Sequence, residues 1–84
     1  MQQFELSKHA LEQIIARGIS EAIIIEVLHS PDFIETEDAE QLIYQKKVIF
    51  ETGKEYLVRV FVNSNKTPNL VKTAYRTSKF SKYE

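Results

Sequence analysis

The chain has 84 residues and a net charge of −1 at pH 7, and it contains no cysteine. This length has room for a single domain, residues 1–84, with one small hydrophobic core. The absence of cysteine excludes disulfides, thiolate zinc sites and a cysteine nucleophile. The N-terminus has neither the basic nor the apolar region of a signal peptide, and no apolar run reaches the length of a membrane span. We therefore expect a cytoplasmic protein that does not enter a membrane.

The small net charge hides an uneven distribution of charged side chains. Residues 1–45 contain two basic and nine acidic residues, a net charge of −7, and residues 46–84 contain nine basic and three acidic residues, a net charge of +6. A basic surface would attract a polyanion such as RNA. The alternative is that the two halves neutralise each other within one small fold.

Two helices are predicted near the start of the chain. Ser7 is a suitable N-cap for a helix over residues 8–17, in which apolar residues recur at helical spacing. Gly18 can end this helix in a left-handed conformation. Ser20 caps a second helix, which must end before Pro31 because proline cannot continue the hydrogen-bond ladder.

Strands are predicted in the rest of the chain, over residues 33–36, 41–51, 56–62 and 70–75. Apolar residues alternate along residues 56–62, so that Tyr56, Val58, Val60 and Val62 form a face that the two helices must cover. The predicted fold class is α+β, with two N-terminal helices packed on one face of a three- to four-stranded antiparallel sheet. The other face is expected to be open and able to bind a partner.

Several short motifs, in this order and at this spacing, resemble those of a known family. They are Ser7-Lys8-His9-Ala10, Arg17-Gly18-Ile19-Ser20, Tyr56-Leu57-Val58-Arg59-Val60 and Lys72-Thr73-Ala74-Tyr75-Arg76-Thr77-Ser78-Lys79. Between Phe4 and Tyr83 the chain is similar to a small bacterial family of domains of unknown function (DUF4258-like). That family resembles the RelE, ParE and BrnT toxins in the order of its elements.

The resemblance implies a RelE/BrnT-like domain that acts as a metal-independent endoribonuclease of a bacterial toxin–antitoxin system. Such a protein would bind RNA, including ribosome-bound messenger RNA, on the open face of the sheet, and a cognate antitoxin protein would inhibit it. No cofactor is expected, and the two histidines and the carboxylates have no spacing typical of a metal site. The alternative is a non-catalytic module of the same fold that binds a partner protein.

Metal-free cleavage of RNA needs a base, an acid and cations that offset the charge on the phosphorane. The candidates for these roles are His9, Arg59 and Tyr75. His9 falls in the first turn of the first helix, and Arg59 lies between two valines on a strand, which places it on the open face. Tyr75 could act as an acid or stack on a base. The structural alternatives are a solvated histidine, a solvated arginine and a half-buried strand tyrosine.

Cations and hydroxyls on the open face and in the basic tail are predicted to bind RNA. They are Lys47, Thr73, Arg76, Lys79 and Lys82. The alternative for the tail is that its aromatic rings pack back onto the sheet. The register of the last strand is ambiguous by one residue, so the face that carries Thr73 and Tyr75 is left open. Arg17, at the end of the first helix, is expected to have a structural role, paired with Glu12 or Glu21; the alternative is contact with a substrate phosphate.

Overall fold

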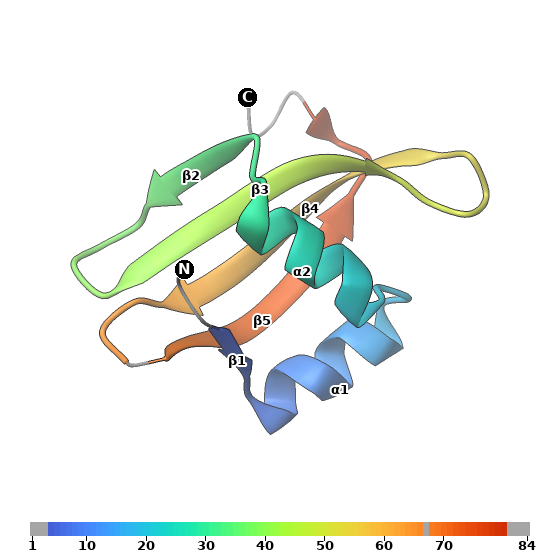
Figure 1. The fold of residues 1–84 in the computed structure, drawn as a ribbon. Coiled ribbons are helices and arrows are strands. Elements are labelled where there is room, and N and C mark those ends of the chain that lie inside the picture. The colour runs from blue at the N-terminus through green and yellow to red at the C-terminus, as the bar shows by residue number, and fades with distance from the viewer. Residues whose placement is uncertain (1–3, 67, 81–84) are drawn as a thin grey trace.

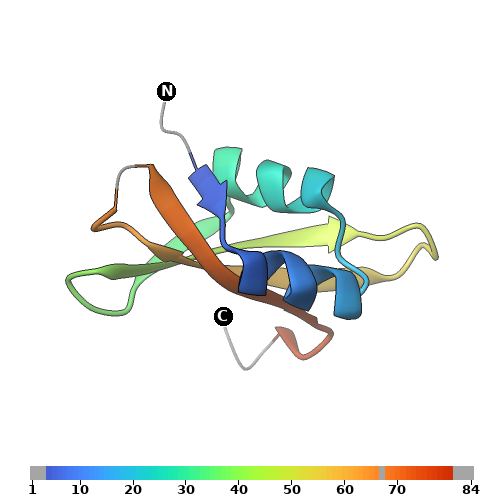
Figure 2. The same cartoon turned by 90° about the horizontal axis from the view of Figure 1, so that it is seen from below.

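Within residues 4–66 and 68–80, which the computed structural model describes, two helices lie on one side of a five-stranded sheet (Figures 1 and 2). In chain order the elements are β1 (Phe4–Leu6), α1 (Lys8–Ala16), α2 (Glu21–His29), β2 (Phe33–Thr36), β3 (Gln41–Ile49), β4 (Glu55–Asn63) and β5 (Asn69–Thr77). The strand order in the sheet is β1-β5-β4-β3-β2. β1 runs parallel to β5, and all other neighbouring strands are antiparallel.

The fold class predicted from the sequence is wrong in its strand count, its strand directions and its element order. The sheet formed by the described residues has five strands and is mixed, because β1 precedes both helices and pairs in parallel with β5. The helices are therefore not both N-terminal. β1 has only three residues, which is too short for an alternating pattern to stand out. Its position is set by pairing with β5, a strand late in the sequence. Directly after β1, Ser7 N donates to Val71 O of β5 at 3.1 Å.

The two helices begin and end close to the predicted residues. The Ser7 side chain accepts a hydrogen bond from Ala10 N at 3.0 Å, and the Ser20 side chain accepts one from Ile23 N at 3.2 Å. Each serine therefore satisfies an amide that the first helical turn leaves without a partner. Gly18 follows α1 with a φ of +68°, a conformation that glycine adopts without steric cost.

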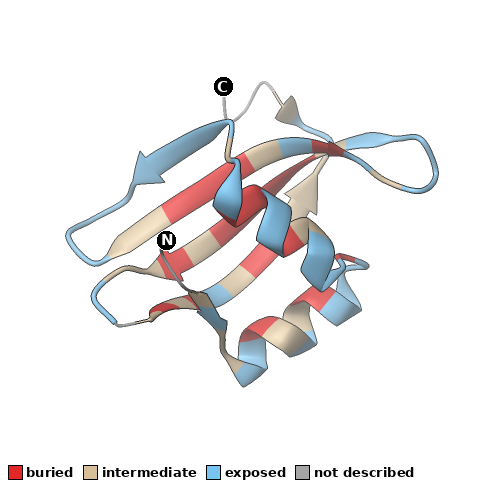
Figure 3. Cartoon of the chain, viewed as in Figure 1, coloured by how far each residue is buried: buried red, intermediate tan, exposed pale blue. Residues whose placement is uncertain are grey.

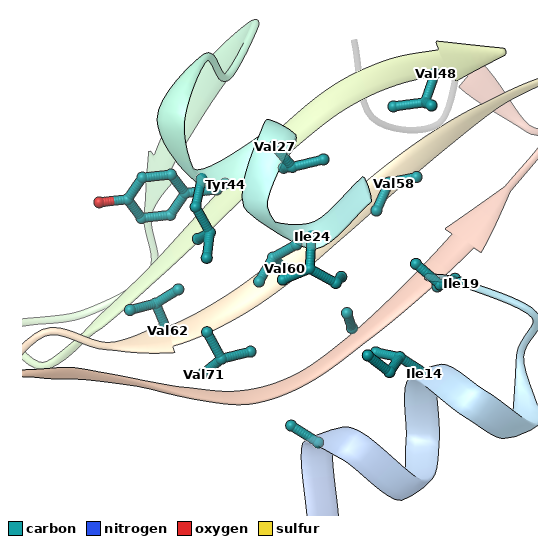
Figure 4. Close-up of a cluster of buried hydrophobic side chains, with 13 residues drawn as sticks. Ile14, Ile19, Ile24, Val27, Tyr44, Val48, Val58, Val60, Val62 and Val71 are labelled. Atoms are coloured by element: carbon teal, nitrogen blue, oxygen red, sulfur yellow. The ribbon is translucent and has the colours of Figure 1, made fainter. Parts of the chain in front are cut away.

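The core lies between the helices and one face of the sheet. α1 packs along β5, and α2 crosses β3 and β4. Figure 4 shows the branched aliphatic side chains of the core pointing toward one another from helices and strands, and Figure 3 shows the same buried stripe across the central strands. The buried cluster comprises Ala10, Ile14, Ile19, Ile24, Val27, Leu28, Tyr44, Val48, Val58, Val60, Val62, Val71 and Ala74.

A β-bulge in β5 changes which side chains face the helices. Val71 pairs with Val62 and Thr73 pairs with Phe61, so Lys72 is an extra residue in the ladder. Val71 and Ala74 are consequently both buried on the helix side, although residues three apart in a regular strand face opposite sides. Beyond the bulge, Thr73 and Tyr75 turn to the face without helices. The bulge therefore determines which face of the sheet carries Thr73 and Tyr75, a point that the sequence left open.

Deletion of Lys72 should preserve the facing of the other β5 side chains, whereas deletion of Ala74 should not. Without Lys72 the ladder becomes regular and Val71, Ala74 and Tyr75 keep their partners, so the free energy of unfolding should fall by less than about 1 kcal/mol. Without Ala74 a polar residue of β5 must face the core, at a cost of about 3 kcal/mol or more. Urea unfolding followed by circular dichroism measures both variants. Equal stability of the two deletion variants would contradict the role given to the bulge.

Candidate functional site

Polar side chains meet at the centre of the sheet face that no described helix covers. We call this surface the helix-free face; it is formed by Ile43, Gln45, Leu57, Arg59, Phe61, Thr73 and Tyr75. Gln45 is directly opposite Arg59 on β4, and Arg59 is directly opposite Tyr75 on β5. Opposite residues in neighbouring antiparallel strands have side chains on the same face. The register of three strands therefore brings these three side chains together.

The guanidinium of Arg59 is held by acceptors from three other strands. Its Nε donates to Gln45 Oε1 at 3.2 Å, its Nη1 donates to the Tyr75 hydroxyl at 2.9 Å, and its Nη2 donates to Glu35 Oε2 at 3.2 Å. Only 7 % of Arg59 is exposed. A cation buried to this extent must be paired and hydrogen-bonded, which explains why β2, β3 and β5 each supply a partner.

Aromatic rings surround this buried cation. The rings of Phe61 and Tyr75 are stacked, with centroids 5.8 Å apart and an interplanar angle of 29°. Arg59 Cζ lies 5.8 Å from the Phe61 centroid and 6.0 Å from the Tyr75 centroid. After β5 the chain turns onto the helix-free face, where Lys47 Nζ lies 5.2 Å from the centroid of Phe80. A surface of this kind combines cations with rings on which a base can stack.

At the edge of β5 an open hollow of about 560 Å³ adjoins the network, and it is lined by Ile15, Ala16, Arg17, Gly18, Tyr75 and Arg76. Arg17 caps α1 and reaches the sheet edge, where its Nη1 donates to Ala74 O at 2.7 Å and to Thr73 Oγ1 at 3.3 Å. These bonds satisfy a carbonyl on the uncovered edge of β5. Tyr75 therefore borders both the Arg59 network and a hollow that contains two arginines.

The structure brings two of the three predicted catalytic residues together. Arg59 and Tyr75 share a hydrogen bond, and Arg59 faces away from the helices as the sequence predicts, although it is buried and not solvated. His9 lies exposed in the first turn of α1, which packs on the other side of the sheet. His9 is thus not part of the Arg59 network.

The predicted RNA-binding residues are divided between the two sides. Lys47 and Thr73 lie on the helix-free face, opposite Leu57 and Phe61 in the neighbouring strand. Arg76 pairs with Val58 and lies on the helix side, beside the end of α1. Lys79 is exposed just after β5, where its backbone N–H donates to Thr77 Oγ1 at 3.1 Å. Lys82 lies outside the described residues.

Sequence reasoning missed Glu35, Gln45 and Phe61 as members of this site and favoured a structural role for Arg17 over contact with a substrate phosphate. Gln45 is a buried polar residue that directly follows three apolar residues of β3, which was a signal that it faces a polar partner. Glu35 lies on a strand far from Arg59 in the sequence, so no local pattern links the two residues. Its role follows only from the order of β2, β3 and β4 in the sheet.

Other site types have no support in the described part of the chain. No group of three or more His, Asp or Glu side chains there is placed to hold a metal ion. No helix in residues 4–66 or 68–80 has the length and apolar character needed to cross a membrane.

The family model described as "Domain of unknown function (DUF4258)" matches residues 6–76. This segment covers most of the chain and includes every helix, together with the Arg59 network and both arginines of the hollow. The chain therefore belongs to this family of domains. No curated protein and no solved structure matches the chain.

Removal of the Tyr75 hydroxyl should cost more stability than neutralisation of Glu35. The Tyr75→Phe variant takes an acceptor from a buried guanidinium, so we expect a loss of about 1–2 kcal/mol in the free energy of unfolding. The Glu35 side chain is 49 % exposed, and the amide oxygen of a glutamine introduced there can still accept. For Glu35→Gln we therefore expect a loss below about 1 kcal/mol. Urea unfolding of both variants measures the difference, and the reverse order would mean that Tyr75 is not a main acceptor.

Proposed function

We propose that this domain is a metal-independent endoribonuclease of the toxin type, acting in the cytoplasm of a bacterium as part of a toxin–antitoxin system. The observation that carries the proposal is the Arg59–Tyr75 pair, in which a buried guanidinium donates to a phenol hydroxyl at 2.9 Å. A phenol beside a fixed guanidinium supplies the acid that RNA cleavage without a metal requires, together with a cation that stabilises the conjugate base of that acid.

In the proposed reaction the 2′-hydroxyl of a ribose attacks the phosphorus of the 3′-phosphate on the same ribose and loses its proton to water. The bond from phosphorus to the 5′-oxygen breaks, and Tyr75 donates its proton to that oxygen. The products are a 2′,3′-cyclic phosphate and a free 5′-hydroxyl. Arg59 stabilises the phenolate that Tyr75 becomes, because the guanidinium already donates to this oxygen. The phenolate regains its proton from water.

The surroundings of the pair support RNA as the substrate. The stacked rings of Phe61 and Tyr75 offer a platform for a base, and Lys47 and Thr73 lie on the same face. The resemblance to RelE, ParE and BrnT toxins, carried by motifs that include Arg59 and Tyr75, supports the same activity. Such toxins are held inactive by an antitoxin protein, and we propose one as the natural partner.

The test is cleavage of a single-stranded RNA oligonucleotide by purified protein in the presence of EDTA. We expect cleaved RNA with 2′,3′-cyclic phosphate ends. Tyr75→Phe should lower the rate by about 100-fold or more, which is typical of the loss of a general acid. Tyr44→Phe is the matched control, because it removes a phenol hydroxyl from the helix side of the same sheet, where burial raises the pKa of Tyr44. This variant should cleave at the rate of the wild-type protein.

His9→Ala separates this proposal from the role predicted for His9 from the sequence. We expect unchanged cleavage by this variant, because α1 holds His9 on the other side of the sheet from Tyr75. Loss of cleavage in His9→Ala with retention in Tyr75→Phe would reverse the assignment. Intact RNA after incubation with the wild-type protein would overturn the nuclease proposal.

A second candidate function is protein binding through the edge strand β2, as in a non-catalytic module. Phe33 and Ile34 are 56 % and 43 % exposed, and Figure 3 shows the whole of β2 as exposed. Glu37 N donates to Gln41 O, so this pair is hydrogen-bonded. Bonded and non-bonded pairs alternate along an antiparallel ladder, and Ile34 therefore falls in a non-bonded pair, with its N–H and C=O pointing away from β3. An extended segment of a partner can pair with such an edge.

Ile34→Glu and Ile25→Glu test this second candidate. Both isoleucines are exposed, but Ile34 lies on the β2 edge and Ile25 lies on α2. The probe is the protein encoded by the neighbouring reading frame, with its affinity measured by calorimetry. We expect Ile34→Glu to weaken binding by about tenfold or more, because it adds a charge to the apolar edge, and Ile25→Glu to leave it unchanged. Equal affinity of the two variants would exclude β2 as the interface.

A further inference from the structure

Arg76 has an environment unlike that of an arginine in an ion pair. Its Cζ lies 4.7 Å from the centroid of the Phe50 ring and 4.6 Å from that of Tyr56, so the guanidinium lies against two rings that contact each other edge to face, with centroids 5.2 Å apart. No carboxylate or hydrogen-bond acceptor in residues 4–66 and 68–80 pairs with it. A half-buried cation with fixed orientation and no anionic partner in the described chain is suited to an external anion.

Arg76 and Gly18 form the common wall of two hollows. The first is the hollow at the β5 edge, where Arg17 is the second cation and no carboxylate is present. The second has a volume of about 430 Å³ and lies between the start of α2 and the β3–β4 hairpin. Ile23 and Phe50 give the second hollow an apolar lining, and Glu51 adds a carboxylate. One hollow is therefore cationic, and its neighbour is apolar with a hydrogen-bond acceptor.

Gly18 keeps the space between these two hollows open. A Cβ atom on this residue would lie 3.3 Å from Arg76 Nη2, so any side chain here would press on the guanidinium. The backbone φ of +68° adds a conformational reason for glycine at this position. Gly53 also has a positive φ, +84°, but its Cβ would meet no atom within 4 Å. Both glycines thus have a positive φ, but only at Gly18 would an added Cβ meet another side chain.

We infer that the two hollows together bind one nucleotide, with its phosphate between Arg17 and Arg76 and its base against Ile23 and Phe50. This inference rests on the proposed function for the identity of the ligand as a nucleotide of the RNA substrate. Tyr75 borders the first hollow, so the bound nucleotide flanks the phosphate that is cleaved. The carboxylate of Glu51 repels a phosphate from the second hollow and can accept from an amino group of the base.

The experiment is an NMR titration of the isotope-labelled full chain with adenosine 5′-monophosphate, adenosine and inorganic phosphate in parallel. We expect saturable shifts of the Gly18, Phe50 and Arg76 amides with the monophosphate. Adenosine and inorganic phosphate should each bind about tenfold more weakly or worse, because each fills one hollow only. Equal affinity for inorganic phosphate and the monophosphate would reduce the site to an anion site and overturn the nucleotide assignment. No shift at these amides with any ligand would overturn the site itself.

Two pairs of variants sharpen the test. Arg76→Met keeps a long side chain against the two rings but removes the cation, and should weaken monophosphate binding by about tenfold. Lys54→Met is its control, because Lys54 Nζ lies 5.3 Å from the Tyr56 centroid but lines neither hollow. Gly18→Ala should weaken binding, and Gly53→Ala should not. Loss of binding in both members of a pair would point to global destabilisation and contradict the assignment.

Failure of this inference can be distinguished from failure of the proposed function. RNA cleavage that is lost in Tyr75→Phe but kept in Arg76→Met, without binding of the monophosphate, would leave the nuclease proposal intact and overturn the nucleotide site. Binding of the monophosphate that is sensitive to Arg76→Met, by a protein that leaves RNA intact, would support the nucleotide site and overturn the nuclease proposal.

Discussion

One extra residue in β5, Lys72, links the core to the candidate site. Val71 and Ala74 both pack against the helices only because the bulge between them shifts the alternation of the strand. The same shift turns Tyr75 toward Arg59. If Lys72 instead took a place in a regular ladder, Val71 and Ala74 would face opposite sides of the sheet, and a strand that kept Val71 in the core would turn Tyr75 away from Arg59. The geometry of the Arg59–Tyr75 pair is therefore fixed by the packing of the core on the other side of the sheet.

The buried guanidinium of Arg59 makes the helix-free face a rigid surface. Four strands each supply one member of the network: Glu35 from β2, Gln45 from β3, Arg59 from β4 and Tyr75 from β5. Because an unpaired buried cation is costly, displacement of any of these strands would carry a penalty beyond the loss of its ladder bonds. A site assembled in this way is already organised before a ligand binds, which reduces the entropy that binding must overcome.

Local signals in the sequence were sufficient for the helices and for four of the strands. The caps Ser7 and Ser20 and the period-two pattern of β4 are contained in short segments. The position of β1, the bulge at Lys72 and the acceptors of Arg59 depend on registers between segments far apart in the chain, which no short pattern encodes. Alternation placed Arg59 on the correct face, but its burial follows from partners on three other strands. Arg76 was predicted from the sequence as an RNA-binding residue, but the same limit concealed its two aromatic neighbours, which lie on the β3–β4 hairpin and at the start of β4.

The charge asymmetry of the chain is resolved differently at the two edges of the sheet. Near β2 the acidic and basic halves neutralise each other, because Asp32 pairs with Lys46 and Glu35 pairs with Arg59. Near β5, no carboxylate of the described residues pairs with Arg17 or Arg76. The cations at the β5 edge therefore suit the proposed RNA ligand, while the exposed apolar residues of β2 suit the proposed protein strand. The two candidate functions thus use opposite edges of one sheet, and Arg59, which lies between them, is bonded to a residue from each edge: Glu35 on β2 and Tyr75 on β5.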